Sequence, residues 1–185
     1  LSASLGQLQK AVVALKGKRR KTQQDNFLPN AVSAPNPKRA VKIELMSMVN
    51  IQWMYGHEPK TLPDDWKEKI QSMFLSETGE EYTHESISNL PIPQWSGNMF
   101  LIDQEQYPTP ESLLGVLWAL PHGQNGVRIA AFVLDSKYQS CGWGGKAWDH
   151  LVEISRAAGK ITIQLEVKAE NSRAQEFYKT RGLTV

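Results

Sequence analysis

The residues best suited to chemistry lie between Gln139 and Gly145, where the sequence reads QSCGWGG. Glycines at 142, 144 and 145 let the backbone turn sharply and approach a ligand without obstruction by a Cβ atom. A helix that begins here directs its unpaired N–H groups and its positive dipole end at one spot, which suits a phosphate. The stretch therefore predicts a phosphate-binding turn between a strand and a helix.

Spacing distinguishes among the known phosphate loops. The Walker loop requires a glycine where this chain has Ser140, and Ser or Thr where it has Ala147. The dinucleotide pattern GxGxxG meets alanine at the same position 147, although its third glycine may be replaced by alanine. The pattern that remains is Gln139-x-x-Gly142-x-Gly144, directly after a run of strand-forming residues.

A second group of residues follows about 30 positions later. Residues 161–168 alternate between apolar and polar types, which predicts a strand with one buried face. Asn171 is a good N-cap for a helix that contains Ala174, Phe177 and Tyr178. A tyrosine phenol is protonated at neutral pH and can donate a proton. By residue type alone, the preferred interpretation of Tyr178 is an aromatic side chain on the buried face of its helix.

Together the two blocks resemble the GNAT family of acetyl-CoA-dependent N-acetyltransferases, over roughly residues 46–185. In that family a Gln or Arg followed by x-x-Gly-x-Gly, or Ala, cradles the pyrophosphate of coenzyme A. The second block is similar to the family's strand-to-helix signature. The resemblance implies an α/β (mixed α+β) fold with a central, mostly antiparallel sheet flanked by helices. It also implies transfer of an acetyl group from acetyl-CoA to an amine by direct attack on the thioester.

The resemblance assigns expected roles residue by residue. Backbone groups near Phe132 and Leu134 are expected to bind the pantetheine arm and to polarise the thioester carbonyl. Asn171 is expected to hydrogen-bond the cofactor between two splayed strands, and Tyr178 to protonate the leaving thiolate as the catalytic residue. The remaining residues of the expected cofactor site are Gln139, Ser140, Cys141, Gly142, Trp143, Gly144 and Gly145, with Ala174 and Phe177 from the second block.

The sequence departs from the family pattern in three places. Ser140 and Cys141 stand where the family usually has a second basic residue and a glycine, and Ser136 replaces the usual proline. The chain stops at Val185, whereas family members continue for two more strands, so we expect a C-terminally truncated domain. The general base is left open between a water chain and several side chains: Glu166, Asp103, Glu81, Glu85 and His122.

Periodicity and turn residues predict the other elements. Helices are expected at 63–75 and, more weakly, at 80–89, and a helix is expected to leave the glycine turn and end at Gly159. Strands are expected at 99–102, 113–120 and 126–134, the last two joined as a hairpin, with at least one more within 41–54. Leu5, Leu8, Val12 and Leu15 predict a short amphipathic helix over residues 1–15.

Charge divides the chain. Residues 1–45 hold nine Lys or Arg against two acidic residues, while the rest holds 12 basic and 17 acidic residues. We therefore expect a basic extension or linker (1–45) before an acetyltransferase domain (46–185). A solvated tail is the simpler interpretation of the basic arm, and nucleic-acid binding through residues 10–42 is the alternative.

Composition restricts the class of protein further. No apolar run is long enough to cross a membrane, and Cys141, the single cysteine, fits a reducing compartment, so we expect a cytoplasmic protein. The four histidines lack the spacing of metal ligands. The expected partners are a small-molecule or protein amine acceptor and a second copy of the chain, paired through the edge of strand 161–168. For the exposed strand edge, the alternative is that the chain belongs to a longer natural protein. For the activity, the alternative is a non-catalytic acyl-CoA-binding module.

Overall fold

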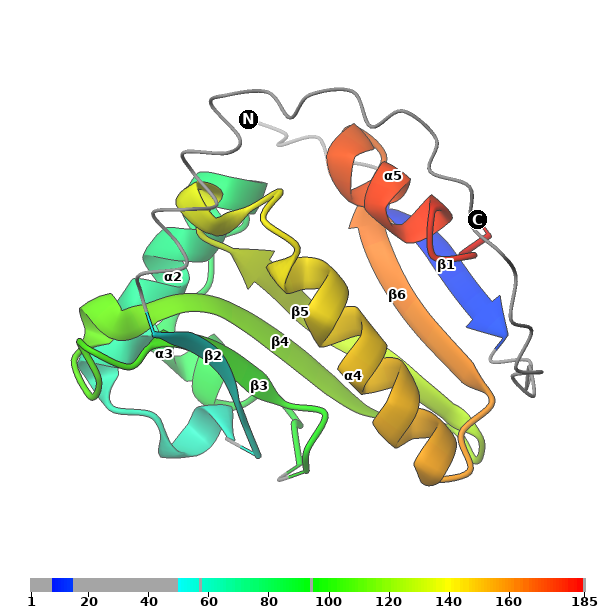
Figure 1. Ribbon diagram of the computed structural model, residues 1–185, viewed down its shortest axis with the longest axis horizontal. Coiled ribbons are helices and arrows are strands. Elements are labelled where there is room, and N and C mark those ends of the chain that lie inside the picture. Colours follow the sequence, from blue (N-terminus) through cyan, green and yellow to red (C-terminus); the bar gives the residue numbers. More distant parts are fainter. Residues whose placement is uncertain (1–7, 15–49, 57, 94, 185) are drawn as a thin grey trace, which may run out of the picture.

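The computed structural model describes residues 8–14, 50–56, 58–93 and 95–184, which include six strands of one sheet (Figure 1). The strand order is β1-β6-β5-β4-β3-β2, and only the β5–β6 pair is parallel. This confirms the expected mixed, mostly antiparallel sheet. The strands are β1 (Leu8–Ala14), β2 (Ile51–Tyr55), β3 (Met99–Asp103), β4 (Leu113–His122), β5 (Gly126–Leu134) and β6 (Thr162–Lys168).

Helices cover both faces of the sheet (Figure 1). On one face α2 (Asp64–Thr78) packs on Phe100, Trp118 and Val133 in a buried apolar cluster that also includes residues of α3 (His84–Ser88). On the other face α4 (Trp143–Ala157) and Tyr178 of α5 (Ser172–Lys179) join a second cluster. The sheet is therefore the middle layer between two cores.

Local sequence explains where these helices begin and end. Acidic residues in the first turn of α2 complement the helix dipole, and Gly79 ends the helix with φ 66°. The predicted helix at 63–75 is confirmed and runs three residues further. Of the helix predicted more weakly at 80–89, only α3 is observed. It begins at His84 because Thr83 and Ser86 form a capping box there.

The predicted strands are also confirmed, at 99–103, 113–122, 126–134 and 162–168. Of the region 41–54, Ile51–Tyr55 forms β2, and the alternating residues 41–45 lie outside the described part of the chain.

The helix predicted over residues 1–15 is wrong for Leu8–Ala14, which form β1. The strand pairs antiparallel with β6 from Leu8↔Lys168 to Ala14↔Thr162. Hydrogen bonds to an open sheet edge outweigh a helical apolar periodicity, since a short isolated helix is only marginally stable. β1 thus occupies the edge at which we expected a second chain or further strands. The domain boundary at residue 45 and the homo-oligomer stay predictions, as does the role of residues 10–42, most of which lie outside the described part.

The β5–β6 pair opens towards its C-terminal end (Figure 1). Its parallel register covers only Gly126–Arg128 of β5 against Thr162–Gln164 of β6. Two residues beyond Arg128, the β4–β5 register shifts, because Trp118 pairs with Ala131 while Ala119 pairs with Ile129. This bulge at Ala130 bends β5, so the two strands separate where the expected site residues begin.

Candidate functional site

A cleft of about 1410 Å³ lies at the open end of the β5–β6 pair. Its walls are the end of β5, the turn before α4, and α5. Twelve of the thirteen expected site residues line it: Phe132, Leu134, Gln139, Ser140, Cys141, Gly142, Gly144, Gly145, Asn171, Ala174, Phe177 and Tyr178. Trp143 does not, because its ring is partly buried against the core, with the Lys146 ammonium 4.1 Å from its centroid. The two sequence blocks therefore meet around one cavity.

The turn before α4 has the backbone shape of an anion cradle. Ser140 and Gly142 both have positive φ angles, 61° and 88°, and α4 starts at the next residue, Trp143. Gly142 is the N-cap, and no side chain accepts from the first N–H groups of the helix. These N–H groups and the positive helix end therefore remain for a ligand in the cleft.

Two of the glycines leave space that a side chain would fill. A Cβ atom on Gly144 would lie 3.3 Å from Phe177, 3.6 Å from Leu134 and 3.6 Å from Phe132. A Cβ atom on Gly145 would lie 3.0 Å from the Arg181 guanidinium. The backbone of the turn thus faces the cleft directly, with apolar side chains on one side and a cation on the other.

The Gln139 side-chain amide fixes the turn to the end of β5 and to α2. Its Nε2 donates to the Leu134 carbonyl at 2.6 Å and to Glu77 Oε2 at 2.8 Å. The other Glu77 oxygen accepts from the Ser136 N–H at 3.2 Å. The last turn of α2 therefore holds both ends of the segment between β5 and the glycines.

Sequence reasoning missed the two arginines that line the cleft. Arg173 donates to Ser140 Oγ at 2.8 Å, so α5 supplies a cation next to the turn. Arg181 lies over the Phe177 ring, 3.6 Å from its centroid, and donates to the Phe177 carbonyl. One signal was present: a basic residue in the first turn of a helix opposes the dipole, as Arg173 does. Glu77 gives a corresponding signal, because an acidic residue in the last turn of a helix also opposes the dipole.

Asn171 and Tyr178 stand on the α5 side of the opening. Asn171 Oδ1 caps α5 by accepting from the Ala174 N–H at 3.0 Å. The Tyr178 ring packs edge-on against Trp148 and Phe177 and is 8% exposed. Burial raises the pKa of the Tyr178 phenol far above its usual value, against a smaller opposing effect of Arg181. The phenol therefore stays protonated at neutral pH.

Of the five base candidates, only Glu166 lines either the cleft or the small cavity beside it, and it lines the small cavity. Asp103 is buried at the end of β3, where it accepts from the Glu105 N–H and the Gln106 side chain. Glu81, Glu85 and His122 line neither cavity. The structure adds Glu80, which lines the same small cavity and was not among the sequence candidates.

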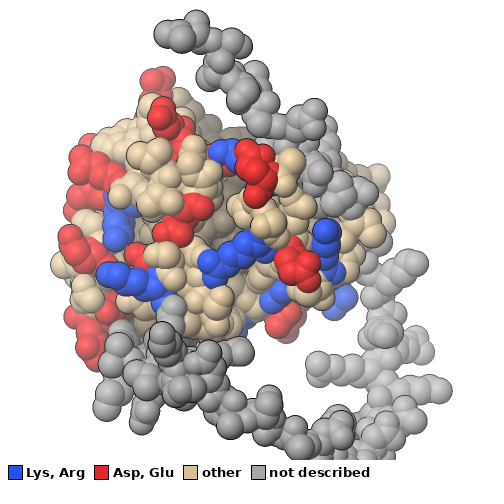
Figure 2. Space-filling model, turned by 90° about the horizontal axis from the view of Figure 1, so that it is seen from above, with Lys and Arg blue, Asp and Glu red and all other residues tan. Residues whose placement is uncertain are grey.

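Charges are unevenly distributed around this end of the molecule. Figure 2 views the end at which β5 and β6 finish, and acidic side chains crowd the margin on the side of α2 and α3. Several basic side chains lie across the middle of the same face. In the described ranges no helix is long and apolar enough to cross a membrane, and no three potential ligand side chains gather as a metal site. A cytoplasmic location stays a prediction.

Known proteins resemble this chain in fold and in family. The model of the acetyltransferase (GNAT) family matches residues 64–183. Ard1 from Thermoplasma volcanium is 20% identical with a TM-score of 0.57, over 72% of this chain and 82% of that one. A GNAT-family acetyltransferase from Staphylococcus aureus is 18% identical with a TM-score of 0.56, over 71% and 83%. No match is found among curated proteins.

A third similar structure is the ribosomal-protein-S18-alanine N-acetyltransferase from Escherichia coli, with 16% identity and a TM-score of 0.53 over 71% and 76% of the two chains. At these identities the structures establish the fold, while the family model spans most of the chain and both sequence blocks. The chain belongs to the GNAT family of acetyltransferases.

Proposed function

We propose that the protein transfers an acetyl group from acetyl-CoA to an amine by direct attack on the thioester. The observation that carries this proposal is the combination in one cleft of an anion cradle and a buried proton donor. The cradle is the turn that ends at Gly142, with Arg173 beside it. The proton donor is Tyr178, on the wall where β5 and β6 separate.

The cofactor is expected to lie along the cleft from the turn to the open strands. The N–H groups between Gln139 and Gly145 hold the pyrophosphate, assisted by the Arg173 guanidinium. The pantetheine arm follows the free edge of β5 near Phe132 and Leu134, where no pairing with β6 is left. Asn171 retains its side-chain NH₂ for the cofactor, because its oxygen is used as a helix cap.

Three steps of the reaction depend on groups of the protein. The acceptor nitrogen attacks the thioester carbonyl, and backbone N–H groups of β5 stabilise the negative charge on its oxygen. The carbon–sulfur bond then breaks, and the Tyr178 phenol donates its proton to the departing thiolate. A base removes the excess proton from the nitrogen and Tyr178 regains a proton, so that the products are an amide and the coenzyme A thiol.

The test combines binding with turnover. Isothermal titration calorimetry should show acetyl-CoA binding to the wild type that weakens about tenfold in Arg173→Gln, the loss of one charge-assisted contact. Arg156→Gln, an exposed arginine in the last turn of α4, is the matched control. Thiol release should be followed with a panel of alkylamines, arylamines and peptides with free N-termini.

Each result of this test decides between named possibilities. Acetyl-CoA binding with acetylated product from at least one amine supports the proposal. Binding without turnover across the panel would instead establish a non-catalytic acyl-CoA-binding module. No binding at all would overturn both.

A further inference from the structure

The last turn of α2 contacts both sides of the cleft through two neighbouring residues, Glu77 and Thr78. Glu77 accepts from the Ser136 N–H and the Gln139 side chain, on the side of the turn before α4. The Thr78 carbonyl accepts from the Lys168 ammonium of β6 at 3.0 Å. One helix end is therefore bound both to the wall that carries the turn and to the wall that leads into α5.

The end of β6 that carries Lys168 lies beyond the paired part of the two parallel strands. The pairing with β5 reaches Gln164, and Lys168 lies four residues further along β6. On its outer side this end of β6 pairs with β1, up to Leu8↔Lys168. Thr78 lines both the cleft and the small cavity beside it, so its contact with Lys168 lies at the opening between β5 and β6.

The contact is electrostatically favourable for α2. The last carbonyls of a helix lack donors within the helix and carry a partial negative charge. The last turn of α2 has no basic residue of its own, and Glu77 adds further negative charge there. The Lys168 ammonium therefore supplies from β6 the cation that this helix end lacks, in a partly buried position where salt screens it less.

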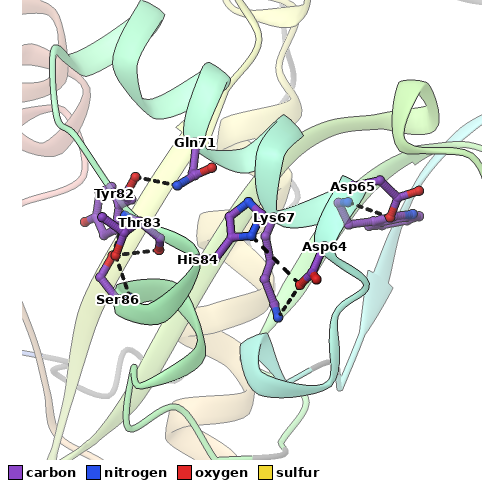
Figure 3. A network of polar contacts seen from close by, with 9 residues as sticks. Asp64, Asp65, Lys67, Gln71, Tyr82, Thr83, His84 and Ser86 are labelled. Carbon is purple, nitrogen blue, oxygen red and sulfur yellow. Dashed lines mark hydrogen bonds and ion pairs between the residues drawn. The ribbon is translucent and has the colours of Figure 1, made fainter.

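Thr78 itself is held by the segment that joins α2 and α3. Its hydroxyl donates to the Phe74 carbonyl at 2.9 Å and accepts from the Glu80 N–H at 3.3 Å. Figure 3 shows that the same segment is bound back to α2, because the Tyr82 carbonyl accepts from the Gln71 side chain at 2.6 Å. The acceptor carbonyl is therefore fixed in position.

Lys168 also holds the start of α5 through its backbone. Its carbonyl accepts from the Asn171 N–H at 3.0 Å and from the Gln175 side chain at 3.3 Å. Asn171 and Tyr178 line the cleft on the α5 side. A displacement of Lys168 therefore moves the α5 wall relative to β5, while the turn before α4 stays attached to Glu77.

We propose that Lys168 is a positioning residue that sets the width of the opening between β5 and β6, and thereby the affinity of the cleft for the pantetheine arm of the cofactor. This inference rests on the proposed acetyl transfer and concerns the part of the cofactor that lies between the strands. Hydrogen bonds weaken steeply with distance, so a wider opening removes contacts of the arm with β5 or with Asn171.

The pyrophosphate contacts should not depend on Lys168. They belong to the turn before α4, which Glu77 holds independently. The long, exposed Arg173 side chain can keep its contact with Ser140 through rotamer changes when α5 shifts. The two ends of the cofactor therefore respond differently to the loss of the Lys168 ammonium.

The test compares acetyl-CoA with 3′-phosphoadenosine 5′-diphosphate, a nucleotide that has the pyrophosphate and lacks the pantetheine arm. In Lys168→Met the dissociation constant of acetyl-CoA should rise about five- to tenfold, the loss of roughly one hydrogen bond, while that of the nucleotide changes less than about twofold. Glu77→Ala should weaken both ligands, because it releases the turn. Calorimetry measures both constants.

Matched variants separate a positioning role from a general loss of stability. Lys168→Arg retains a cationic donor and should keep acetyl-CoA affinity within about twofold of the wild type. Lys179→Met removes an exposed lysine of α5 outside both cavities and should change neither constant. Lys168→Gln, with a shorter and uncharged donor, should show the same selective loss and serves where the methionine variant does not fold.

Three results would overturn the inference: equal weakening of the two ligands by Lys168→Met, unchanged acetyl-CoA affinity in that variant, or an arginine variant as weak as the methionine variant. Selective loss of acetyl-CoA affinity that arginine restores supports it. Absence of acetyl-CoA binding by the wild type would instead overturn the proposed acetyl transfer, so the two failures are distinguishable.

Discussion

Tyr178 combines an observed packing role with the chemical role that we propose for it. Its ring contacts Trp148 and Phe177, and Tyr178→Phe retains those contacts. We predict that this variant lowers kcat by about 10- to 1000-fold, the usual range for loss of a general acid, with little change in acetyl-CoA affinity. Steady-state kinetics with the best amine of the panel, together with calorimetry, measure both quantities. Wild-type turnover would reduce Tyr178 to a packing residue.

Gly144 is the position where the turn comes closest to the apolar wall of the cleft. A Cβ atom added at Gly144 would already lie 3.3 Å from Phe177, so the branched side chain of Gly144→Val must enter the cleft. We predict about tenfold or greater weakening of acetyl-CoA binding, with an intermediate loss in Gly144→Ala. Calorimetry on variants with native circular dichroism gives the answer. An unchanged dissociation constant for the valine variant removes the phosphate-cradle assignment.

Tyr82 predicts a pH dependence of folding. Burial and the neighbouring Glu80 raise its pKa to about 12 in the folded protein, from an ordinary value of 10.0. The folded state therefore binds the phenol proton more tightly, and the stability that depends on it is present below pH 10 and declines as the pH rises towards 12. Tyr82→Phe should flatten the decline in urea unfolding between pH 10 and 12. Tyr55→Phe, at an exposed tyrosine, should not.

At the scale of elements, α2 supports the turn before α4. Glu77 accepts from the Ser136 N–H and from the Gln139 side chain, near the two ends of the segment that leaves β5. We predict that Glu77→Ala weakens acetyl-CoA binding several-fold through a less ordered cradle, whereas kcat at saturation changes little. Glu77→Gln retains an acceptor oxygen and should lose less. Equal losses in the two variants would indicate an electrostatic effect of the carboxylate in place of a positioning one.

Most elements were predictable because their signals are local. The alternation over 161–168, the glycines before α4 and the Asn171 cap each depend on neighbouring residues. Contacts between distant elements have no such signal, and the sequence did not indicate that Arg173 reaches Ser140 or that Glu77 reaches Gln139. β1 was missed for the same reason, since the partner that makes Leu8–Ala14 a strand is at the far end of the chain.

At the scale of the whole molecule, β1 closes an edge that otherwise exposes β6 along Thr162–Lys168. We predict that deleting residues 1–14 lowers the melting temperature and drives association at micromolar concentration, because an unpaired strand edge binds another strand. Light scattering and thermal unfolding of the full and shortened chains measure the two effects. A shortened chain that stays monomeric with unchanged stability would show that β6 does not need this strand.

The β1–β6 pairing also sets an order of events for the nascent chain. Ala14 and its partner Thr162 are 148 positions apart, so β1 leaves the ribosome long before β6 exists. At typical rates of synthesis this interval lasts roughly 7 to 30 s, far longer than a hairpin needs to form. The β4–β5 hairpin can fold within that interval, and β1 completes the sheet only when translation reaches Lys168. Among the six described strands, β1 is thus the first to be synthesised and among the last to be incorporated.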